Sequence, residues 1–363
     1  MSAGVDLERS QNPAQQRESR EPTLGESLMA REAKEAPQAV AHAIAANREA
    51  LRDLGALLRK RAPRAVVTCA RGSSDHAATF AKYLIETRTG VITSSAAPSV
   101  SSVYESAPAM RDAVCLAISQ SGRSPDLLAS VEAARRGGAF VIALVNADDT
   151  PLAAMADAAV PLHAGPELSV AATKSYITAL TAVIQLVGEW AQDAELLTAL
   201  DGAPELLERA THLNWNAAVE ALTPARNLYT VGRGLGFGIA QEAALKFKET
   251  CGLHAEAFSA AEVRHGPMAL VTEGFPVLAF AQDDATRPGL EALAADLSRD
   301  GAKVLLAGAD GAAATVLPTL KAHPVLQPVL EIQSFYGMAA RLSHARGFDA
   351  DKPPHLNKVT RTV

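Results

Sequence analysis

One α/β unit occurs twice along the chain, at an offset of about 160 residues. In the first copy, a short apolar stretch at residues 65–70 runs into Arg71-Gly72-Ser73-Ser74 and then into a helical pattern. In the second, residues 228–231 run into Gly232-Arg233-Gly234-Leu235-Gly236 and another helical pattern. Strands that alternate with helices build parallel sheets covered on both faces. The repeat therefore predicts an α/β fold with two duplicated domains, each a doubly wound parallel sheet.

Apolar runs and helical spacing divide the rest of the chain. We expect further strands at residues 113–118, 139–145, 158–162, 276–281, 303–307 and 325–330. Helical patterns occur at residues 27–61, 176–190 and 194–222. The expected organisation is a flexible polar tail at 1–26, a first domain at 27–200, a second domain at 201–346, and a non-helical tail at 347–363 that closes the active site, with two prolines against helix formation.

Composition excludes several classes of function. A formal net charge of -6 without a local Lys/Arg cluster argues against a nucleic-acid partner. The apolar stretch at 176–190 is too short to span a bilayer, so no membrane association is expected. The polar first residues resemble neither a signal peptide nor a transit peptide, which predicts a cytoplasmic protein. Cys69, Cys115 and Cys251 are far apart and are expected to be reduced core thiols.

The two copies differ most in their serines. The first has Gly72-Ser73-Ser74 after one strand and Ser119-Gln120-Ser121-Gly122-Arg123-Ser124 after another, where the second has Gly234-Leu235-Gly236 and Gln282-Asp283-Asp284. A serine before a helix is most often only an N-cap. Hydroxyl groups in two such turns, absent from the other copy, instead favour a phosphate site, because helix N-termini present unpaired N–H groups and partial positive charge.

The helix after Gly236 carries Glu242, Lys246 and Glu249 on one stripe. On this helix alone, the favoured interpretation is an exposed ladder of ion pairs. The following segment, residues 253–267, reads as a loop that is rich in histidine and glutamate. Its composition suggests acid–base chemistry without assigning roles.

Several ordered motifs resemble the SIS (sugar isomerase) family over nearly the whole chain, in particular the isomerase half of glucosamine-6-phosphate synthase. These motifs are Ser119-Gln120-Ser121-Gly122, Val170-Ala171-Ala172-Thr173-Lys174, Ala244-Leu245-Lys246-Phe247-Lys248-Glu249, His254-Ala255-Glu256-Ala257, His265-Gly266-Pro267 and Asn357-Lys358-Val359-Thr360.

The resemblance implies a role for each matching position. Gly72, Ser73, Ser74, Ser119, Gln120, Ser121 and Ser124 would hold the phosphate of a phosphosugar, and Val170 and Ala172 would line the sugar. Glu249 would move the proton between C1 and C2, with Lys246 beside it, and His265 would open the sugar ring. Lys358 falls on the family's Schiff-base lysine. The family's pairing implies a homodimer in which His265 acts across the interface.

The synthase has a glutaminase domain that has no counterpart in this sequence. Arg71-Gly72-Ser73-Ser74-Asp75-His76-Ala77, Ser121-Gly122-Arg123-Ser124-Pro125-Asp126 and Asp351-Lys352-Pro353 instead resemble SIS-type glucosamine-6-phosphate deaminases, whereas the synthase has a cysteine in place of Arg71. The resemblance therefore implies conversion of glucosamine 6-phosphate to fructose 6-phosphate and ammonia. Another SIS isomerase or deaminase, a fructosamine-6-phosphate deglycase and a non-catalytic phosphosugar sensor stay open. We expect neither a metal nor a cofactor, because the reaction needs only acid–base groups and the histidines lack zinc-site spacing.

Overall fold

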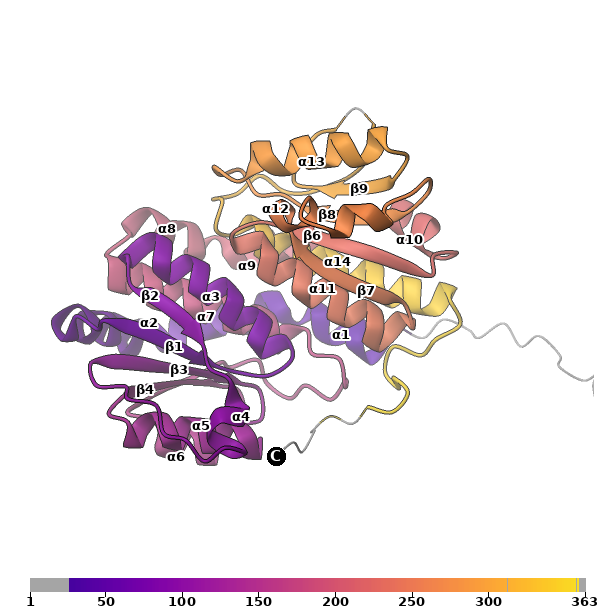
Figure 1. Cartoon of the computed structure of the whole chain (residues 1–363). Coiled ribbons are helices and arrows are strands. Elements are labelled where there is room, and N and C mark those ends of the chain that lie inside the picture. The colour runs from indigo at the N-terminus through magenta and orange to yellow at the C-terminus, as the bar shows by residue number, and fades with distance from the viewer. Residues whose placement is uncertain (1–25, 312, 357, 359–363) are drawn as a thin grey trace, which may run out of the picture.

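The chain folds around two parallel sheets that have the same strand order (Figure 1). The structure is a computed structural model that describes residues 26–311, 313–356 and 358. The first sheet, ordered β2-β1-β3-β4-β5, contains β1 (Ala65–Cys69), β2 (Ile92–Ser95), β3 (Ala113–Ser119), β4 (Phe140–Val145) and β5 (Ala158–Pro161). The second, ordered β10-β9-β8-β6-β7, contains β6 (Asn227–Gly232), β7 (His254–Ser259), β8 (Pro276–Phe280), β9 (Lys303–Ala307) and β10 (Thr315–Leu317). Read from its other edge, the second sheet repeats the order of the first, which confirms the predicted duplication.

Helices cover both faces of the first sheet, as the fully apolar central strands require. Here α2 (Ala36–Arg61), α3 (Ser73–Thr89) and α7 (Lys174–Ala191) pack on one face. The other face is covered by α5 (Pro125–Arg136) and α6 (Pro151–Met155), and α4 (Pro98–Ser102) packs against α5. The helix α7 is almost entirely buried, as predicted. In the part of the chain that the structure describes, no helix is long and apolar enough to cross a membrane.

One hydrophobic core continues from the first lobe into the second. It is centred on α3 of the first lobe, α11 (Leu235–Cys251) and α14 (Gln327–Ala345), and includes Phe80, Phe247 and Phe335. Gly238 lets α11 approach α3 closely, since a Cβ atom there would lie 2.7 Å from the backbone oxygen of His76. The lobes are therefore held in one fixed relation, which matters for any site that uses residues from both.

Other helices link and complete the lobes. The predicted helical connection consists of α8 (Ala194–Asp201), α9 (Ala203–Thr211) and α10 (Asn216–Leu222). The second lobe also contains α12 (Ala260–Val263), the 3-10 helix η2 (Pro267–Leu270) and α13 (Arg287–Arg299). Cys69, Cys115 and Cys251 are free and buried, and burial raises the pKa of each thiol, which agrees with the prediction of core thiols.

The predicted strand at residues 325–330 is wrong. Its residues lead into and begin α14, where Pro328 occupies the first turn, and β10 forms the sheet edge instead. The loop expected at 253–267 is also wrong in part, because β7 occupies its first half. A short apolar run fits the start of a buried helix as well as a strand, whereas an edge strand such as β7 needs few apolar residues.

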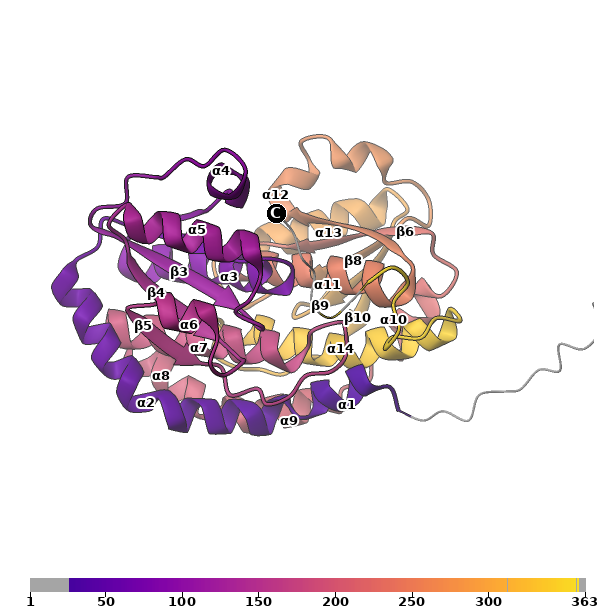
Figure 2. The ribbon, with the colours of Figure 1, turned by 90° about the horizontal axis from the view of Figure 1, so that it is seen from below.

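Opposite ends of the described chain meet at α1 (Leu28–Lys34), which lies against α14 (Figure 2). The carboxylate of Asp351 accepts hydrogen bonds from the backbone N–H groups of Leu28 (2.6 Å) and Met29 (2.8 Å). Ser27 caps the same helix through Ala30 N–H. The segment after α14 is turn-like rather than helical, as its prolines predict. Residues 1–25 of the predicted N-terminal tail, and residues 357 and 359–363 of the C-terminal one, lie outside the described residues.

Candidate active site

The turn after β1 leads directly into the first residues of α3. Gly72 is the N-cap, with φ 56° and ψ -131°, and Ser73 and Ser74 follow as the first two helical residues. Gly234 caps α11 with nearly the same angles, φ 60° and ψ -128°, so the two lobes share this turn in backbone geometry. A positive φ of this kind is accessible to glycine without strain. The serines therefore sit on a scaffold that both copies use.

The turn after β3 contains the remaining predicted phosphate residues. Ser119 ends the strand, and its buried hydroxyl accepts a hydrogen bond from Gly122 N–H at 3.0 Å, which braces the turn. Gln120 and Ser121 are half-buried beside it. Ser124 is the N-cap residue of α5, yet its side chain makes no capping hydrogen bond. The ordinary capping role therefore does not account for Ser124.

The strand order brings these two turns together. β1 and β3 are hydrogen-bonded neighbours, so both turns lie at the same edge of the sheet. From this edge α3 leads to β2 on one side, while α5 leads to β4 on the other. In open α/β sheets, such a reversal in strand order creates the crevice in which ligands bind. The structure thus places Ser73, Ser74 and the 119–124 turn together at the switch point, where this kind of fold predicts a ligand crevice.

The equivalent crevice of the second lobe is filled by a side chain. Gln282 Nε2 donates to Arg233 O at 2.8 Å and to Thr286 Oγ1 at 2.9 Å. A Cβ atom at Gly236 would lie 2.7 Å from Gln282 Oε1, which shows how closely the amide packs against the start of α11. The difference between the copies that was inferred from the sequence therefore corresponds to serine-bearing turns in the first lobe and a packed glutamine side chain at the equivalent place in the second.

The predicted exposed ladder on α11 is wrong. The side chains of Glu242 and Lys246 are 0% and 1% exposed, and that of Glu249 is 18% exposed. Lys246 Nζ lies 2.5 Å from Glu249 Oε2 and 3.3 Å from Glu242 Oε1. It also donates to Ser73 Oγ at 3.1 Å, which links the second lobe to the first-lobe turn. Sequence spacing identified the stripe, but only the packing of α3 and α14 against α11 decides that it is buried.

Glu242 contacts side chains of two other helices, α3 and α14. Its Oε1 atom accepts hydrogen bonds from Ser73 Oγ at 3.1 Å and Tyr336 Oη at 3.2 Å, and its Oε2 atom lies 2.9 Å from His76 Nδ1. Burial alone would raise the pKa of Glu242, but Lys246 and His76 outweigh burial and hold it below its usual value. Burial likewise opposes the charge of Lys246, yet Glu242 and Glu249 raise the pKa of the ammonium above its usual value. The cluster is thus a charged, hydrogen-bonded bridge between the lobes.

Sequence reasoning missed His76, Tyr336 and the central position of Glu242. His76 lies one helical turn after Ser73, and this spacing was the available signal for a shared helix face. Tyr336 lies on α14, in the region whose beginning was taken for a strand, and no local pattern connects it with α11.

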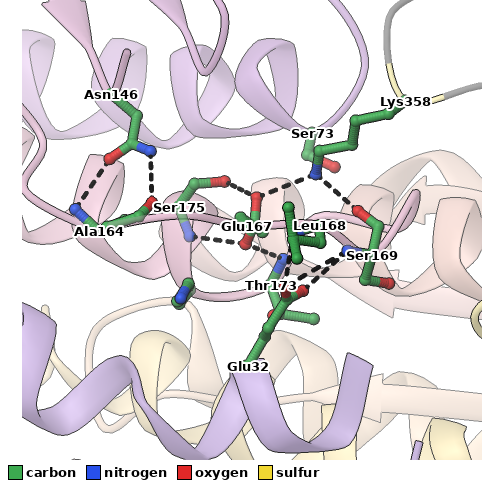
Figure 3. A network of polar contacts seen from close by, with 12 residues as sticks. Glu32, Ser73, Asn146, Ala164, Glu167, Leu168, Ser169, Thr173, Ser175 and Lys358 are labelled. Carbon is green, nitrogen blue, oxygen red and sulfur yellow. Dashed lines mark hydrogen bonds and ion pairs between the residues drawn. The ribbon is translucent and has the colours of Figure 1, made fainter. Parts of the chain in front are cut away.

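The segment expected to line the sugar is held by two buried carboxylates (Figure 3). Glu167 accepts hydrogen bonds from the backbone N–H groups of Thr173 (3.0 Å) and Ser175 (3.1 Å), and so closes the loop on itself. From α1, Glu32 accepts from Leu168 N–H (2.5 Å) and Ser169 N–H (3.1 Å). Between these anchors, Val170 and Ala172 are half-buried while their neighbours are buried, which leaves both accessible to a ligand.

Lys358 reaches this loop from the C-terminal segment (Figure 3). Its Nζ atom donates to Ser169 O at 2.6 Å and lies 3.4 Å from Glu167 Oε2. His265, in contrast, is exposed, and its side chain makes no hydrogen bond or ion pair with a described residue. The structure therefore brings Lys246, Glu249 and Ser73 together and docks Lys358 on the 167–173 loop, while the sugar contacts of this loop and the role of His265 across an interface stay predictions. Among the described residues, no group of three or more His, Cys, Asp or Glu side chains could hold a metal ion.

Comparison with known proteins gives consistent relationships. The model of the SIS domain family matches residues 60–188 and 221–311. The chain is 35% identical to the glutamine–fructose-6-phosphate aminotransferase (isomerizing) of Aeropyrum pernix over 309 residues, which cover 79% of this chain and 49% of the relative. The corresponding enzyme of Thermococcus kodakarensis is 32% identical over 353 residues, 91% of this chain and 57% of the relative. The chain spans about half the length of the curated relatives it matches.

Solved structures agree with this relationship. A protein of Silicibacter pomeroyi DSS-3, provisionally named as a phosphosugar isomerase, superposes with a TM-score of 0.86 at 42% identity, covering 90% of this chain and all of the other. The glucosamine-6-phosphate deaminase of Thermotoga maritima superposes with a TM-score of 0.75 at 21% identity, covering 93% of this chain and 100% of that one, which shows a shared fold.

Proposed function

This chain belongs to the SIS domain family, and we propose that it is a glucosamine-6-phosphate deaminase that converts glucosamine 6-phosphate and water to fructose 6-phosphate and ammonia. One observation carries the proposal. Lys246 contacts both Ser73, in the crevice proposed for the phosphate, and Glu249, the proposed catalytic carboxylate. A substrate anchored by its phosphate in the first lobe would therefore lie beside the acid–base groups of the second.

The first-lobe crevice would bind the phosphate through N–H groups at the starts of α3 and α5 and through the hydroxyl groups of Ser73, Ser74, Ser121 and Ser124. Gln120 would add an amide, and Val170 and Ala172 would contact the sugar. Anchoring the far end of the substrate holds C1 and C2 near Glu249. Positioning of this kind can lower a reaction barrier by several kcal/mol.

Glu249 has the geometry expected of a proton shuttle. Its side chain is 18% exposed, so a ligand can reach the carboxylate, and Lys246 fixes its orientation from the buried side. It would take the proton from C2 of the open-chain amino sugar and return it to C1, while the C1 oxygen gains a proton and the amino group loses one, which leaves a hydroxyl at C1 and an imine at C2. Water then adds to C2 and ammonia departs. Lys246 would stabilise the negative charge that develops during the proton transfer.

The contacts of Lys358 support a role in closing the site. Its ammonium is paired with Glu167 and with the carbonyl of Ser169. A lysine that forms a Schiff base must present a neutral, unengaged amine, and hydrolysis of the C2 imine requires no such lysine. We therefore propose that Lys358 holds the 167–173 loop in place. We also propose a homodimer in which His265 opens the sugar ring of the partner's substrate.

The test supplies the purified chain with glucosamine 6-phosphate and measures ammonia and fructose 6-phosphate. Glu249→Gln should lower kcat by roughly 10²- to 10⁴-fold, because a positioned base is lost, while substrate binding is kept. Glu220→Gln, at an exposed position on α10, is the matched control.

Other outcomes point elsewhere. Isomerisation without ammonia would identify a simple aldose–ketose isomerase, and release of an amino acid from a fructosamine 6-phosphate would identify a deglycase. Full turnover by Glu249→Gln would overturn the catalytic assignment. Phosphosugar binding without turnover of any of these substrates would indicate a sensor.

A further inference from the structure

An arginine–aspartate pair spans the crevice between the two serine-bearing turns. Arg71 lies between β1 and the N-cap Gly72, and both its Nε (2.8 Å) and its Nη2 (2.6 Å) donate to Oδ2 of Asp126 on α5. The Asp126 side chain is 0% exposed and that of Arg71 is 49% exposed. The pair therefore ties the start of α5 to the turn before α3, with its cationic end toward solvent.

The location of Asp126 is unfavourable for anion binding unless its charge is offset. It lies in the first turn of α5, and its Oδ1 atom accepts a hydrogen bond from Leu127 N–H at 2.8 Å. A carboxylate at this place opposes the positive potential that a helix N-terminus offers to a phosphate. Arg71 neutralises that carboxylate and adds donors of its own. A guanidinium has five N–H groups, of which two are used here, and the remaining three make no hydrogen bond with a described residue.

A comparison with the second lobe indicates whether the Arg71–Asp126 pair serves folding or ligand binding. Arg233 occupies the position equivalent to Arg71, directly before the N-cap Gly234. The helix equivalent to α5 is α13, which has no acidic residue in its first turn, and Gln282 fills the crevice beside it. Both copies thus have the arginine, but the buried carboxylate partner occurs only beside the serine-bearing turns. A pair needed for the fold alone would be expected in both.

We propose that Arg71 contacts the substrate's phosphate and determines specificity for phosphorylated sugars, and that Asp126 is the positioning residue that fixes its guanidinium. The inference rests on the proposed function, since it requires a phosphosugar in the first-lobe crevice. Asp126 occupies one edge of the guanidinium, and the remaining edge presents N–H groups to a phosphate dianion. A lysine would keep the charge but lose the planar fork that can bond both groups at once.

The test compares Arg71→Gln, Arg71→Lys and Asp126→Asn with the wild-type chain and with Arg233→Gln, the matched control in the second lobe. For each, kcat and KM are measured with glucosamine 6-phosphate, competitive inhibition is measured with inorganic phosphate, and thermal unfolding reports on the fold. Loss of a charge-assisted contact predicts a rise of roughly 10- to 100-fold in KM and in the phosphate inhibition constant for Arg71→Gln. Because the phosphate lies far from C1 and C2, kcat should change little. Arg71→Lys and Asp126→Asn should show smaller increases.

The outcomes distinguish this inference from the proposed function. A wild-type chain that neither turns over nor binds a phosphosugar contradicts both. If the wild type is active and Arg71→Gln keeps its KM and its phosphate inhibition, Arg71 is not a phosphate contact. A lower unfolding temperature with unchanged phosphate inhibition would assign the pair a structural role, and equal effects of Arg71→Gln and Arg233→Gln would remove the distinction between the lobes.

Discussion

Replacing Lys246 with methionine tests whether the buried charge bridge stabilises the fold. Methionine keeps most of the length of lysine but removes the ammonium between Glu242 and Glu249. Glu242 would stay 0% exposed and lose the cation that lowers its pKa most. Removing one partner of a buried ion pair typically costs about 3–5 kcal/mol, because the remaining charge is left without compensation. We expect a loss of that size in the free energy of unfolding at pH 7.

The loss should depend on pH in a defined direction. In the wild type, the pKa of Glu242 is held below its usual value, so its stabilising contribution is present above the unfolded pKa near 4.5 and is lost as pH falls through the folded pKa. Without Lys246, burial should raise that pKa above 4.5, which makes the ionised carboxyl increasingly unfavourable as pH rises. Because of both effects, the difference in the free energy of unfolding between wild type and Lys246→Met should be largest at neutral pH and smaller near pH 4.5.

Urea denaturation of both chains at pH 4.5, 6 and 7.5 would measure this difference. The double variant Glu242→Gln with Lys246→Met should recover much of the lost free energy, since no charge is then buried alone at position 242. An exposed ion pair contributes up to about 1 kcal/mol. If Lys246→Met lowers the free energy of unfolding at pH 7.5 by no more than that, the reasoning is refuted. A deficit that is the same at all three pH values would also refute it.

Three further changes test other features. Glu331→Leu should raise the unfolding temperature, and should raise it more at pH 8 than at pH 5. Neither carboxyl oxygen of this buried residue has a hydrogen-bond partner among the described residues, and burial raises the pKa of Glu331 well above its usual value. The carboxyl group therefore destabilises the fold increasingly as pH rises above about 4.5. Gly238→Ala should lower the free energy of unfolding by about 1–3 kcal/mol in urea denaturation, because the new Cβ atom meets the backbone of α3, and an unchanged value would contradict the close approach. Glu32→Ala should release the 167–173 loop and so raise KM for the phosphosugar several-fold, the effect of about 1 kcal/mol. An unaltered KM in steady-state kinetics would show that the loop needs no such anchor.

Strand alternation made the duplicated fold predictable, because central strands such as β3 and β4 are buried on both faces and therefore read as continuous apolar runs. The edge strands were harder. β2 consists of Ile-Thr-Ser-Ser, and β7 has a single fully buried residue, Ala255, so neither has the composition of a core strand. The run at 325–330 has the apolar character of a strand, but it belongs to the approach and first turn of a buried helix.

The two halves of the candidate site were predictable to different degrees. The serine-bearing turns could be predicted because the second copy of the repeat lacks the serines that the first copy has at the same places. Their neighbourhood depends on the pairing of β1 with β3, which no local pattern gives. The burial of Lys246 depends on α3, about 170 residues earlier in the chain, as its bond to Ser73 shows. Local sequence therefore predicts an exposed ladder where tertiary packing makes a buried bridge.

The bond between Asp351 and the first turn of α1 has a consequence for how the protein is made. The residues that it joins are separated by 323 positions, so α1 leaves the ribosome long before the carboxylate that caps it. Glu32, on that helix, anchors the loop on which Lys358 finally docks. Both sheets therefore precede, in the sequence, Asp351 and Lys358, which contact α1 and the 167–173 loop. A chain clipped after α14 would keep both sheets but lose the contacts of Asp351 with α1 and of Lys358 with the 167–173 loop.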